Sequence, residues 1–148
     1  MTSFWDSAAR EDICRRVEQL TPDAAAQWGK FTAPKMLAHL NDAMRMASGD
    51  LAVAPKNTPL RFWPLKQLVI YVLPFPKGAP TAPELLARCD ASDLKAEQAA
   101  FRGLADRVAA KSADEAWPPH PAFGMLTHNA WGVLAWRHAD HHLRQFGV

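Results

Sequence analysis

Four stretches of the chain carry apolar residues at intervals of three or four positions, which is the spacing of one helix face. The first covers residues 6–20, the second runs from Pro34 to Ser48, the third covers residues 92–111, and the last follows Thr127. Polar and charged residues fill most of the intervening positions. The pattern predicts four helices, each with one face buried against the others.

Residue types that favour helix termini lie at these boundaries. The segment Thr21-Pro22-Asp23 ends the first helix, and Thr32-Ala33-Pro34 gives the second an N-cap followed by a proline in its first turn. Asp90 and Ser92 are candidate N-caps of the third helix, and Thr127 can cap the last. Caps and periodicity therefore indicate the same four helices.

The segment between Leu51 and Pro83 has no clear period. Its Val69-Ile70-Tyr71-Val72 core is apolar and rich in branched residues, which fits either a buried strand or a helix. The sequence offers no second convincing strand, so we predict an additional helix here. Prolines and glycines at 74–83 and again at 117–124 predict crossing loops. The expected fold is all-α, a four-helix bundle in a single domain spanning residues 1–148.

Composition narrows the functional classes. The 148 residues are 49% apolar and 22% charged, as in an ordinary globular domain. A net charge of +2 without basic clusters argues against nucleic-acid binding. The apolar run Leu65 to Leu73 is about half of a bilayer span, so no membrane association is expected. The N-terminus lacks a signal-peptide pattern, which predicts a cytoplasmic protein with Cys14 and Cys89 as free thiols.

Three of the six histidines fall within five positions near the C-terminal end, from His138 to His142. At 3.6 residues per turn, His138 and His142 lie one turn apart on the same helix face, so both rings can point at one shared atom. This is a spacing at which paired histidines bind metal ions. Histidines are also favoured near helix C-termini by the macrodipole, and solvated surface residues remain the alternative reading.

A catalytic zinc or nickel site usually takes three protein ligands and leaves one position open. His39 is the best third candidate, because it is the only histidine in the first hundred-odd residues and lies in the middle of the second predicted helix. Packing of the second and last helices side by side would bring His39 to the pair. We therefore predict a three-histidine metal site of His39, His138 and His142.

Other side chains accompany these histidines. Trp131, Leu134 and Gln145 share the face of His138 and His142, where they could line a pocket or simply belong to the core. Asp42 could support an imidazole by a hydrogen bond, although a solvated or ion-paired carboxylate is the commoner case. His141 lies about 100° around the axis from its neighbour, which favours a supporting or surface role.

Two arginines of the last helix add a further option. Arg137 and Arg144 could bind a carboxylate of an anionic thiol cofactor or substrate, or they could be solvated. His120 and His128 belong to a loop and to a helix start, where we expect structural roles, with His120 a weak candidate for the pocket mouth.

Several of these motifs are similar to those of a known superfamily. Trp28 followed by the helix of His39, and a last helix ending His138-x-x-His141-His142-x-x-Gln145, resemble the DinB-like (YfiT-like) superfamily of metalloenzymes. The segments at 74–81, 120–124 and 137–147 resemble an uncharacterised branch of it. The resemblance implies a four-helix bundle that binds zinc, nickel or another divalent ion through His39, His138 and His142. It also implies, for characterised relatives, use of a low-molecular-weight thiol and frequent dimers.

The expected chemistry follows from a cation held by neutral imidazoles, which lowers the pKa of a bound water or thiol. Zinc proteases place a glutamate after the first histidine of His-Glu-x-x-His, whereas this chain has Ala139. We therefore expect a metal-dependent enzyme that activates a low-molecular-weight thiol for transfer to an electrophilic small molecule. A metal-dependent hydrolase and a non-catalytic, metal-stabilised binding module remain the alternatives.

Overall fold

The computed structural model describes residues 1–86 and 93–148, and within them the chain is helical without a strand. The long helices are α1 (Ser7–Glu18), α2 (Ala33–Ser48), α4 (Leu94–Ala110) and α5 (His128–Gln145). The shorter elements are α3 (Leu65–Tyr71) and the 3-10 helices η1 (Pro59–Arg61) and η2 (Pro83–Leu85). The prediction of an all-α fold with four main helices and one extra helix is confirmed.

Side-chain caps set where the long helices begin. Asp6, Thr32 and Thr127 each accept hydrogen bonds from backbone N–H groups in the first turn of α1, α2 and α5. Asp93 caps α4 in the same way, through the N–H of Ala96. The predicted caps Asp90 and Ser92, and the thiol of Cys89, lie outside the described residues.

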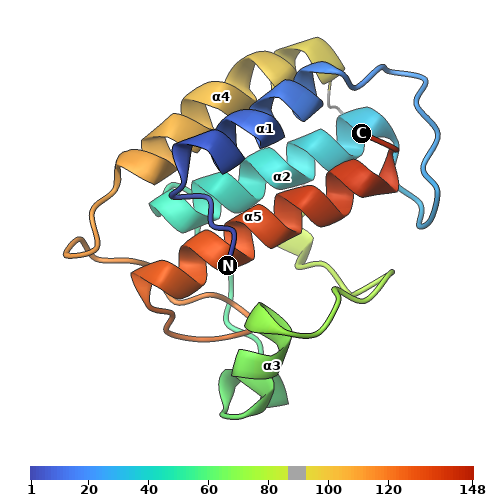
Figure 1. Cartoon of the computed structure of the whole chain (residues 1–148). Helices are drawn as coiled ribbons and strands as arrows, with labels where there is room; N and C mark the ends of the chain where they lie inside the picture. The colour runs from blue at the N-terminus through green and yellow to red at the C-terminus, as the bar shows by residue number, and fades with distance from the viewer. Residues whose placement is uncertain (87–92) are drawn as a thin grey trace.

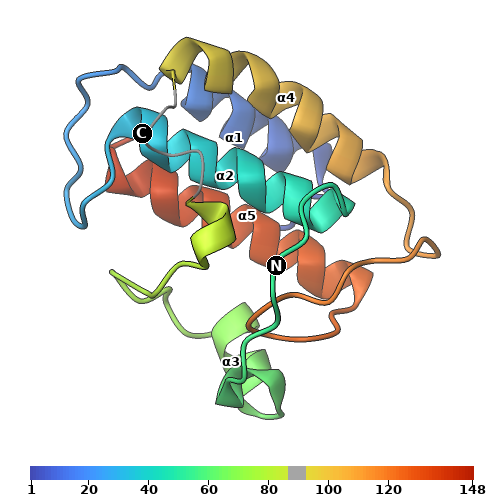
Figure 2. The same ribbon diagram turned by 180° about the vertical axis from the view of Figure 1, so that it is seen from behind.

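The four long helices surround one core. In Figures 1 and 2, α1 lies against α4 and α5, and α2 lies against the same two helices from the other side. A closed arrangement of this kind places one face of every helix toward the interior. The arrangement also brings α2 and α5, which carry the clustered histidines, into direct contact.

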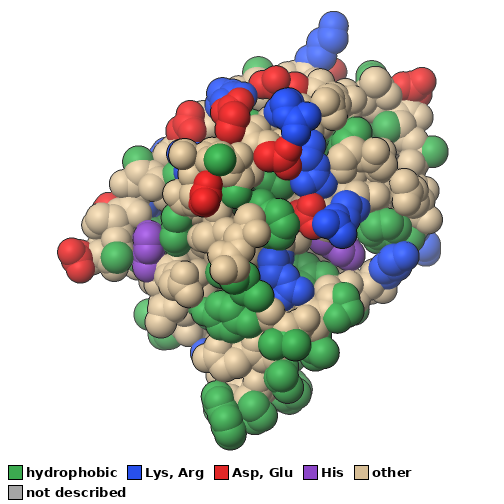
Figure 3. Space-filling view, in the orientation of Figure 1, with side chains coloured by type: hydrophobic (Ala, Val, Ile, Leu, Met, Phe, Trp, Pro, Cys, Tyr) green, Lys and Arg blue, Asp and Glu red, His purple; other side chains and the backbone are tan. Residues whose placement is uncertain are grey.

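The extra helix α3 is short and projects from the side of the bundle next to α5 (Figures 1 and 2), where apolar side chains gather at the surface (Figure 3). Phe62, Trp63 and Val72 are 66%, 81% and 68% exposed. Only Ile70 of α3 is buried. Nearby prolines confine the helix to two turns, because proline restricts the residue before it and lacks an N–H donor.

Arg137 of α5 ties α3 to the bundle. Its guanidinium donates to the backbone carbonyls of Val69, Ile70 and Leu73, and the Nη1 to Val69 O distance is 2.9 Å. Arg137 is therefore not simply solvated, because its guanidinium has backbone partners. Its binding of a ligand carboxylate stays a prediction. The carbonyls at the end of a short helix have no helical partners, and an arginine satisfies three of them.

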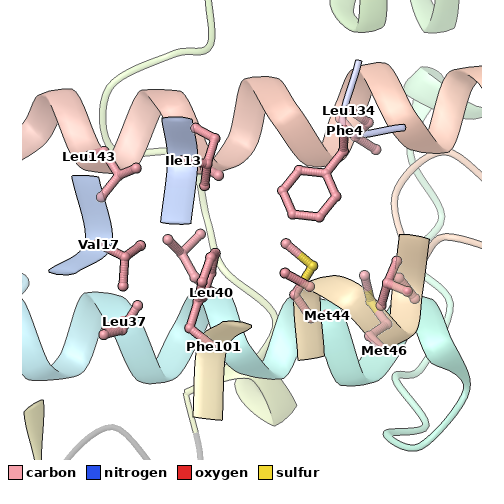
Figure 4. Close-up of a cluster of buried hydrophobic side chains, with 14 of the residues drawn as sticks. Phe4, Ile13, Val17, Leu37, Leu40, Met44, Met46, Phe101, Leu134 and Leu143 are labelled. Carbon is pink, nitrogen blue, oxygen red and sulfur yellow. The ribbon is translucent and has the colours of Figure 1, made fainter. Parts of the chain in front are cut away.

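The core lies between the four long helices, as Figure 4 shows. Its largest fully buried side chains come from the N-terminal segment and from α1, α2, α3, α4 and α5, and include Phe4, Ile13, Val17, Met36, Leu37, Leu40, Ile70, Phe101, Val108, Val133 and Leu143. Burying an apolar side chain of this size contributes about 1.5–3 kcal/mol. The core therefore supplies a rigid frame for the polar residues between α2 and α5.

The N-terminal segment packs directly on α5 at Gly132. The N–H of Phe4 donates to the Gly132 carbonyl at 2.9 Å, and Trp5 Nε1 donates to the His128 carbonyl at 2.8 Å. A Cβ on Gly132 would lie 2.4 Å from Ser3 Oγ and from Trp5 Nε1. Glycine at this helical position allows the close approach, and the ring of His128 stacks on Trp5.

His120 organises the loop before α5. Its Nδ1 accepts hydrogen bonds from the backbone N–H groups of Ala122 and Phe123, and its backbone pairs with Gly124. Burial lowers the pKa of His120 to about 4. This histidine is structural, as predicted.

Among the described helices, none combines the length and the apolarity that crossing a bilayer requires.

Candidate metal centre

The three histidines predicted as ligands meet where α2 crosses α5. One ring nitrogen from each of His39, His138 and His142 lies within 4.8 Å of the other two. The ring centroids are 4.9–5.1 Å apart. Residues 99 positions apart in the chain are thus brought together, with His39 3% exposed and the other two partly exposed. The three rings could hold one metal ion.

Two of the facing nitrogens lie close to the separation that a shared ion would impose, and slightly nearer to each other. His39 Nε2 is 3.0 Å from His138 Nε2. Two ligands of a tetrahedral zinc ion, each at about 2.0–2.1 Å from it, lie about 3.3 Å apart. Converging nitrogens of this kind need either a shared proton or a shared cation, since two lone pairs repel each other.

A backbone carbonyl orients His39. Its Nδ1 lies 3.3 Å from the Leu85 carbonyl oxygen, which can only accept, so the proton of the ring is on Nδ1. Nε2 then carries the lone pair and faces His138. Leu85 belongs to η2, so this short element sets which nitrogen of His39 is available for a metal.

A glutamine orients His142 in the same manner. His142 Nδ1 lies 2.9 Å from Gln145 Oε1, and Gln145 Nε2 donates to the Trp28 carbonyl at 2.6 Å. An amide nitrogen that donates to a carbonyl fixes which end of the side chain is the oxygen, so His142 must donate from Nδ1. Its Nε2 is left as the potential ligand. Ligating histidines in proteins are usually held by such outer partners.

The loop before α2 is closely fitted to Gln145. The N–H of Gln27 donates to the Gln145 backbone carbonyl at 2.7 Å. Gly29 has φ = +76°, and a Cβ there would lie 2.7 Å from Gln145 Nε2. Glycine is thus required both by the backbone conformation and by the closeness of the amide.

Burial keeps the three imidazoles neutral. Desolvation lowers the pKa of His39, lowers that of His138 well below its usual value, and lowers that of His142 to about 3. The neighbouring imidazoles add to the effect on His138 and His142. Neutral imidazole is the form that binds metals. The site therefore needs no deprotonation before an ion enters at neutral pH.

Phe31 covers the histidine cluster from one side. Its ring stacks on His39 at 5.5 Å with an interplanar angle of 23°, and its edge meets His142 at 5.7 Å. An apolar ring here restricts the rotation of both imidazoles and excludes water from that side of the cluster.

The other predicted site residues divide into supporting and structural ones. Gln145 supports His142, as described. Asp42 is buried and forms an ion pair with Arg45 at 2.8 Å. Burial lowers the pKa of His39, and the charge of Asp42 only partly opposes that shift. Trp131 and Leu134 are buried in the hydrophobic core.

His141 lies beside the cluster rather than in it. Its ring centroid is 5.2 Å from that of His142 and 5.6 Å from that of Trp28. Asp140, the residue before His141 in α5, pairs with Arg16 of α1 at 2.9 Å. The C-terminal motif thus serves three purposes: ring nitrogens for the site, an outer support for them, and a link to α1.

Sequence reasoning missed three contributors to the site. The Leu85 and Trp28 carbonyls carry no signature in the sequence, because every residue has one. Phe31 could have been noticed, since an aromatic residue just before the helix of His39 can reach its first turns.

Comparison with known proteins assigns the chain to a family. Neither the curated proteins nor the solved structures give a match to this chain. A family model described as a protein of unknown function (DUF1569) matches residues 6–147. The matched range includes all three histidines and every supporting residue described above. The chain therefore belongs to the DUF1569 family of proteins of unknown function.

Proposed function

We propose that the protein is a divalent-metal-dependent enzyme that activates a low-molecular-weight thiol for transfer to an electrophilic small molecule. His39, His138 and His142 would hold the ion, with zinc or nickel fitting three imidazole donors best. The observation that carries the proposal is the convergence of three ring nitrogens within 4.8 Å, two of the rings being turned by carbonyl oxygens on their far side. The resemblance to the DinB-like superfamily supports the same reading.

The donor set favours chemistry that needs a strongly positive centre. A divalent cation bound here would lower the pKa of a bound thiol or water toward neutrality. The three histidines are neutral, so they leave the charge of such an ion undiminished. The substrate thiol would give up its proton to solvent, and its sulfur would form a bond to the electrophilic carbon. The bond from that carbon to its leaving group would break at the same time, and the leaving group would depart with the electron pair.

The surroundings favour thiol transfer over peptide hydrolysis. Ala139 occupies the position where a zinc protease carries its glutamate base. Asp42, the buried carboxylate one turn from His39, is already paired with Arg45. Thiolate attack requires only the loss of the thiol proton, which the ion itself promotes.

Metal content is the first test. Protein purified without an affinity tag and supplied with zinc or nickel is expected to bind one ion per chain. His138→Ala and His142→Ala should each lose it while circular dichroism stays helical, and His120→Asn serves as a histidine control outside the site. Stoichiometric metal retained in both alanine variants would refute the proposed ligands.

A hydrolase is the second candidate, and His141 is the observation that favours it. This ring lies beside His142, and burial lowers its pKa, so it is neutral at pH 7 and can accept a proton from water. Metal-loaded protein should be assayed with thiol-plus-electrophile pairs and with ester and amide panels. Turnover of esters or amides without a thiol would favour the hydrolase.

A non-catalytic bundle is the third candidate. The 3.0 Å contact between His39 Nε2 and His138 Nε2 also fits a direct hydrogen bond, with His138 donating to His39. Failure of the wild-type protein to take up zinc or nickel after reconstitution would favour this reading.

A further inference from the structure

A cleft opens next to the histidine cluster, between α5 and the loop that follows α3. It has a volume of about 290 Å³. The side chains that matter for its chemistry are Trp28, Phe75, Lys77, Arg137, His141 and Arg144. Figure 3 shows basic, apolar and histidine side chains side by side on the face formed by α5. None of the three proposed ligands lines the cleft.

The cleft has an excess of positive charge. Among the described residues, three cationic side chains line it, against the carboxylate of Asp140. That carboxylate is shared between Arg144, at 3.0 Å, and Arg16 on the neighbouring helix, at 2.9 Å. The charge of Asp140 is thus already matched. The positive charges of Lys77 and Arg137 have no negative counterpart among the described residues that line the cleft.

Arg137 shows most clearly a positive charge without a negative partner among the described contacts. The partners described for its guanidinium are backbone carbonyls and the ring of Phe75, 4.9 Å away, and none of them carries a negative charge. Lys77 lies over the ring of Trp28 at 4.3 Å, which is likewise a neutral partner. Cations held against apolar rings attract an anion more strongly than fully solvated cations do.

Aromatic rings form the rest of the wall. The ring of His141 is tilted against Trp28 at 5.6 Å and against Phe75 at 5.9 Å. Rings arranged in this way suit a flat or apolar group, and the cations beside them suit a carboxylate or a phosphate.

The cleft is coupled to the histidine cluster through two residues. His141 separates the cleft from His142, with 5.2 Å between ring centroids. Trp28 lines the cleft with its side chain, while its carbonyl holds Gln145, the support of His142. A molecule in the cleft therefore lies against the same residues that orient one proposed ligand.

We propose that this cleft binds a small organic anion, a carboxylate or phosphate attached to an aromatic or apolar body, with Lys77 and Arg137 facing the anionic group. That this anion is a substrate of the metal centre rests on the proposed function. The binding itself does not, because the cleft is built without the three ligands.

Binding of phenyl phosphate and benzoate, with benzyl alcohol as the neutral probe, tests the proposal. Isothermal titration is carried out on zinc-loaded wild-type protein and on zinc-free His142→Ala protein. Both are expected to bind the two anions and to bind benzyl alcohol at least about tenfold more weakly. Lys77→Gln should weaken phenyl phosphate binding about fivefold, as expected for one exposed charge pair. Lys95→Gln, on α4 and outside the cleft, should leave it unchanged.

The possible failures are distinguishable. The proposed anion site is refuted by any of three results: charged and neutral probes bind equally, neither anion binds, or Lys77→Gln has no effect. Phenyl phosphate that binds only with zinc and ignores Lys77→Gln has bound the metal, which also overturns it. A protein that binds no zinc but binds phenyl phosphate in a manner dependent on Lys77 would refute the proposed function and leave the cleft standing.

Discussion

Replacing Gln145 by methionine tests whether the outer support of His142 matters for metal binding. Gln145 is 3% exposed, accepts from His142 Nδ1 at 2.9 Å and donates to the Trp28 carbonyl at 2.6 Å. Methionine fills a similar volume without either hydrogen bond. The imidazole then loses the partner that turns its Nε2 toward His39 and His138.

The Gln145→Met substitution should have two separate effects, one on metal affinity and one on the stability of the metal-free protein. Loss of an outer hydrogen bond to a ligating histidine weakens metal affinity about 10- to 100-fold, or about 1.4–2.7 kcal/mol. In the metal-free protein, a ring N–H and a carbonyl lose their partner together, which lowers the free energy of unfolding by about 1–3 kcal/mol. The first effect concerns only the ion, and the second concerns the fold.

Competition with a chromophoric chelator measures the zinc affinity, and urea unfolding of metal-free protein measures the stability. Gln98→Met is the matched control, because Gln98 Nε2 also donates to backbone carbonyls, those of Val17 and Leu20, away from the histidines. The control should lose stability and keep its zinc affinity. Zinc affinity of Gln145→Met within twofold of wild type would refute the proposed orientation of His142.

Three further predictions concern glycines and a histidine. Gly29→Ala should weaken zinc binding, because its Cβ would displace the side-chain amide of Gln145. Gly49→Ala is the control: Gly49 also has a positive φ but has open space around it, so this variant should lose only about 1 kcal/mol of stability. Chelator competition measures the zinc affinity of both variants, and urea unfolding measures their stability. Gly132→Ala should lower the unfolding free energy by about 1–3 kcal/mol through overpacking, while Gly103→Ala in open helix should raise it by up to about 1 kcal/mol; the reverse order would contradict the packing argument. His120 has a folded pKa of about 4 against about 6.5 unfolded, so the unfolded chain binds more protons and stability is lost as pH falls from 6.5 toward 4, by up to about 1.4 kcal/mol per unit. The pH profile of urea unfolding for metal-free His120→Asn should be flatter than that of wild type, and an identical slope would refute the assignment.

The long helices were predictable because local rules agree with the packing. Apolar periodicity and the caps Thr32 and Thr127 indicate α2 and α5 from the sequence, and the spacing of His138 and His142 fixes their shared face. Only the meeting of these two helices had to be assumed, and the structure confirms it.

The contacts that the sequence did not predict have one feature in common: each involves a backbone carbonyl. Arg137 is an ordinary surface arginine in the sequence, yet it binds the carbonyls that end α3. Nothing in the sequence indicates that the Leu85 carbonyl orients His39 or that the Trp28 carbonyl accepts from Gln145. Such contacts depend on where a loop passes, and periodicity carries no information about loop paths.

His39 and His138 are 99 residues apart in the sequence, and this separation bears on how much of the protein a cell retains. An ion that needs both residues binds only chains in which the two helices have already met, so it stabilises the folded state by mass action. Free metal at a hundred times the dissociation constant would add about 2.7 kcal/mol. Proteases degrade mostly the unfolded fraction, so metal starvation would lower the abundance of this protein even if none of its synthesis were altered.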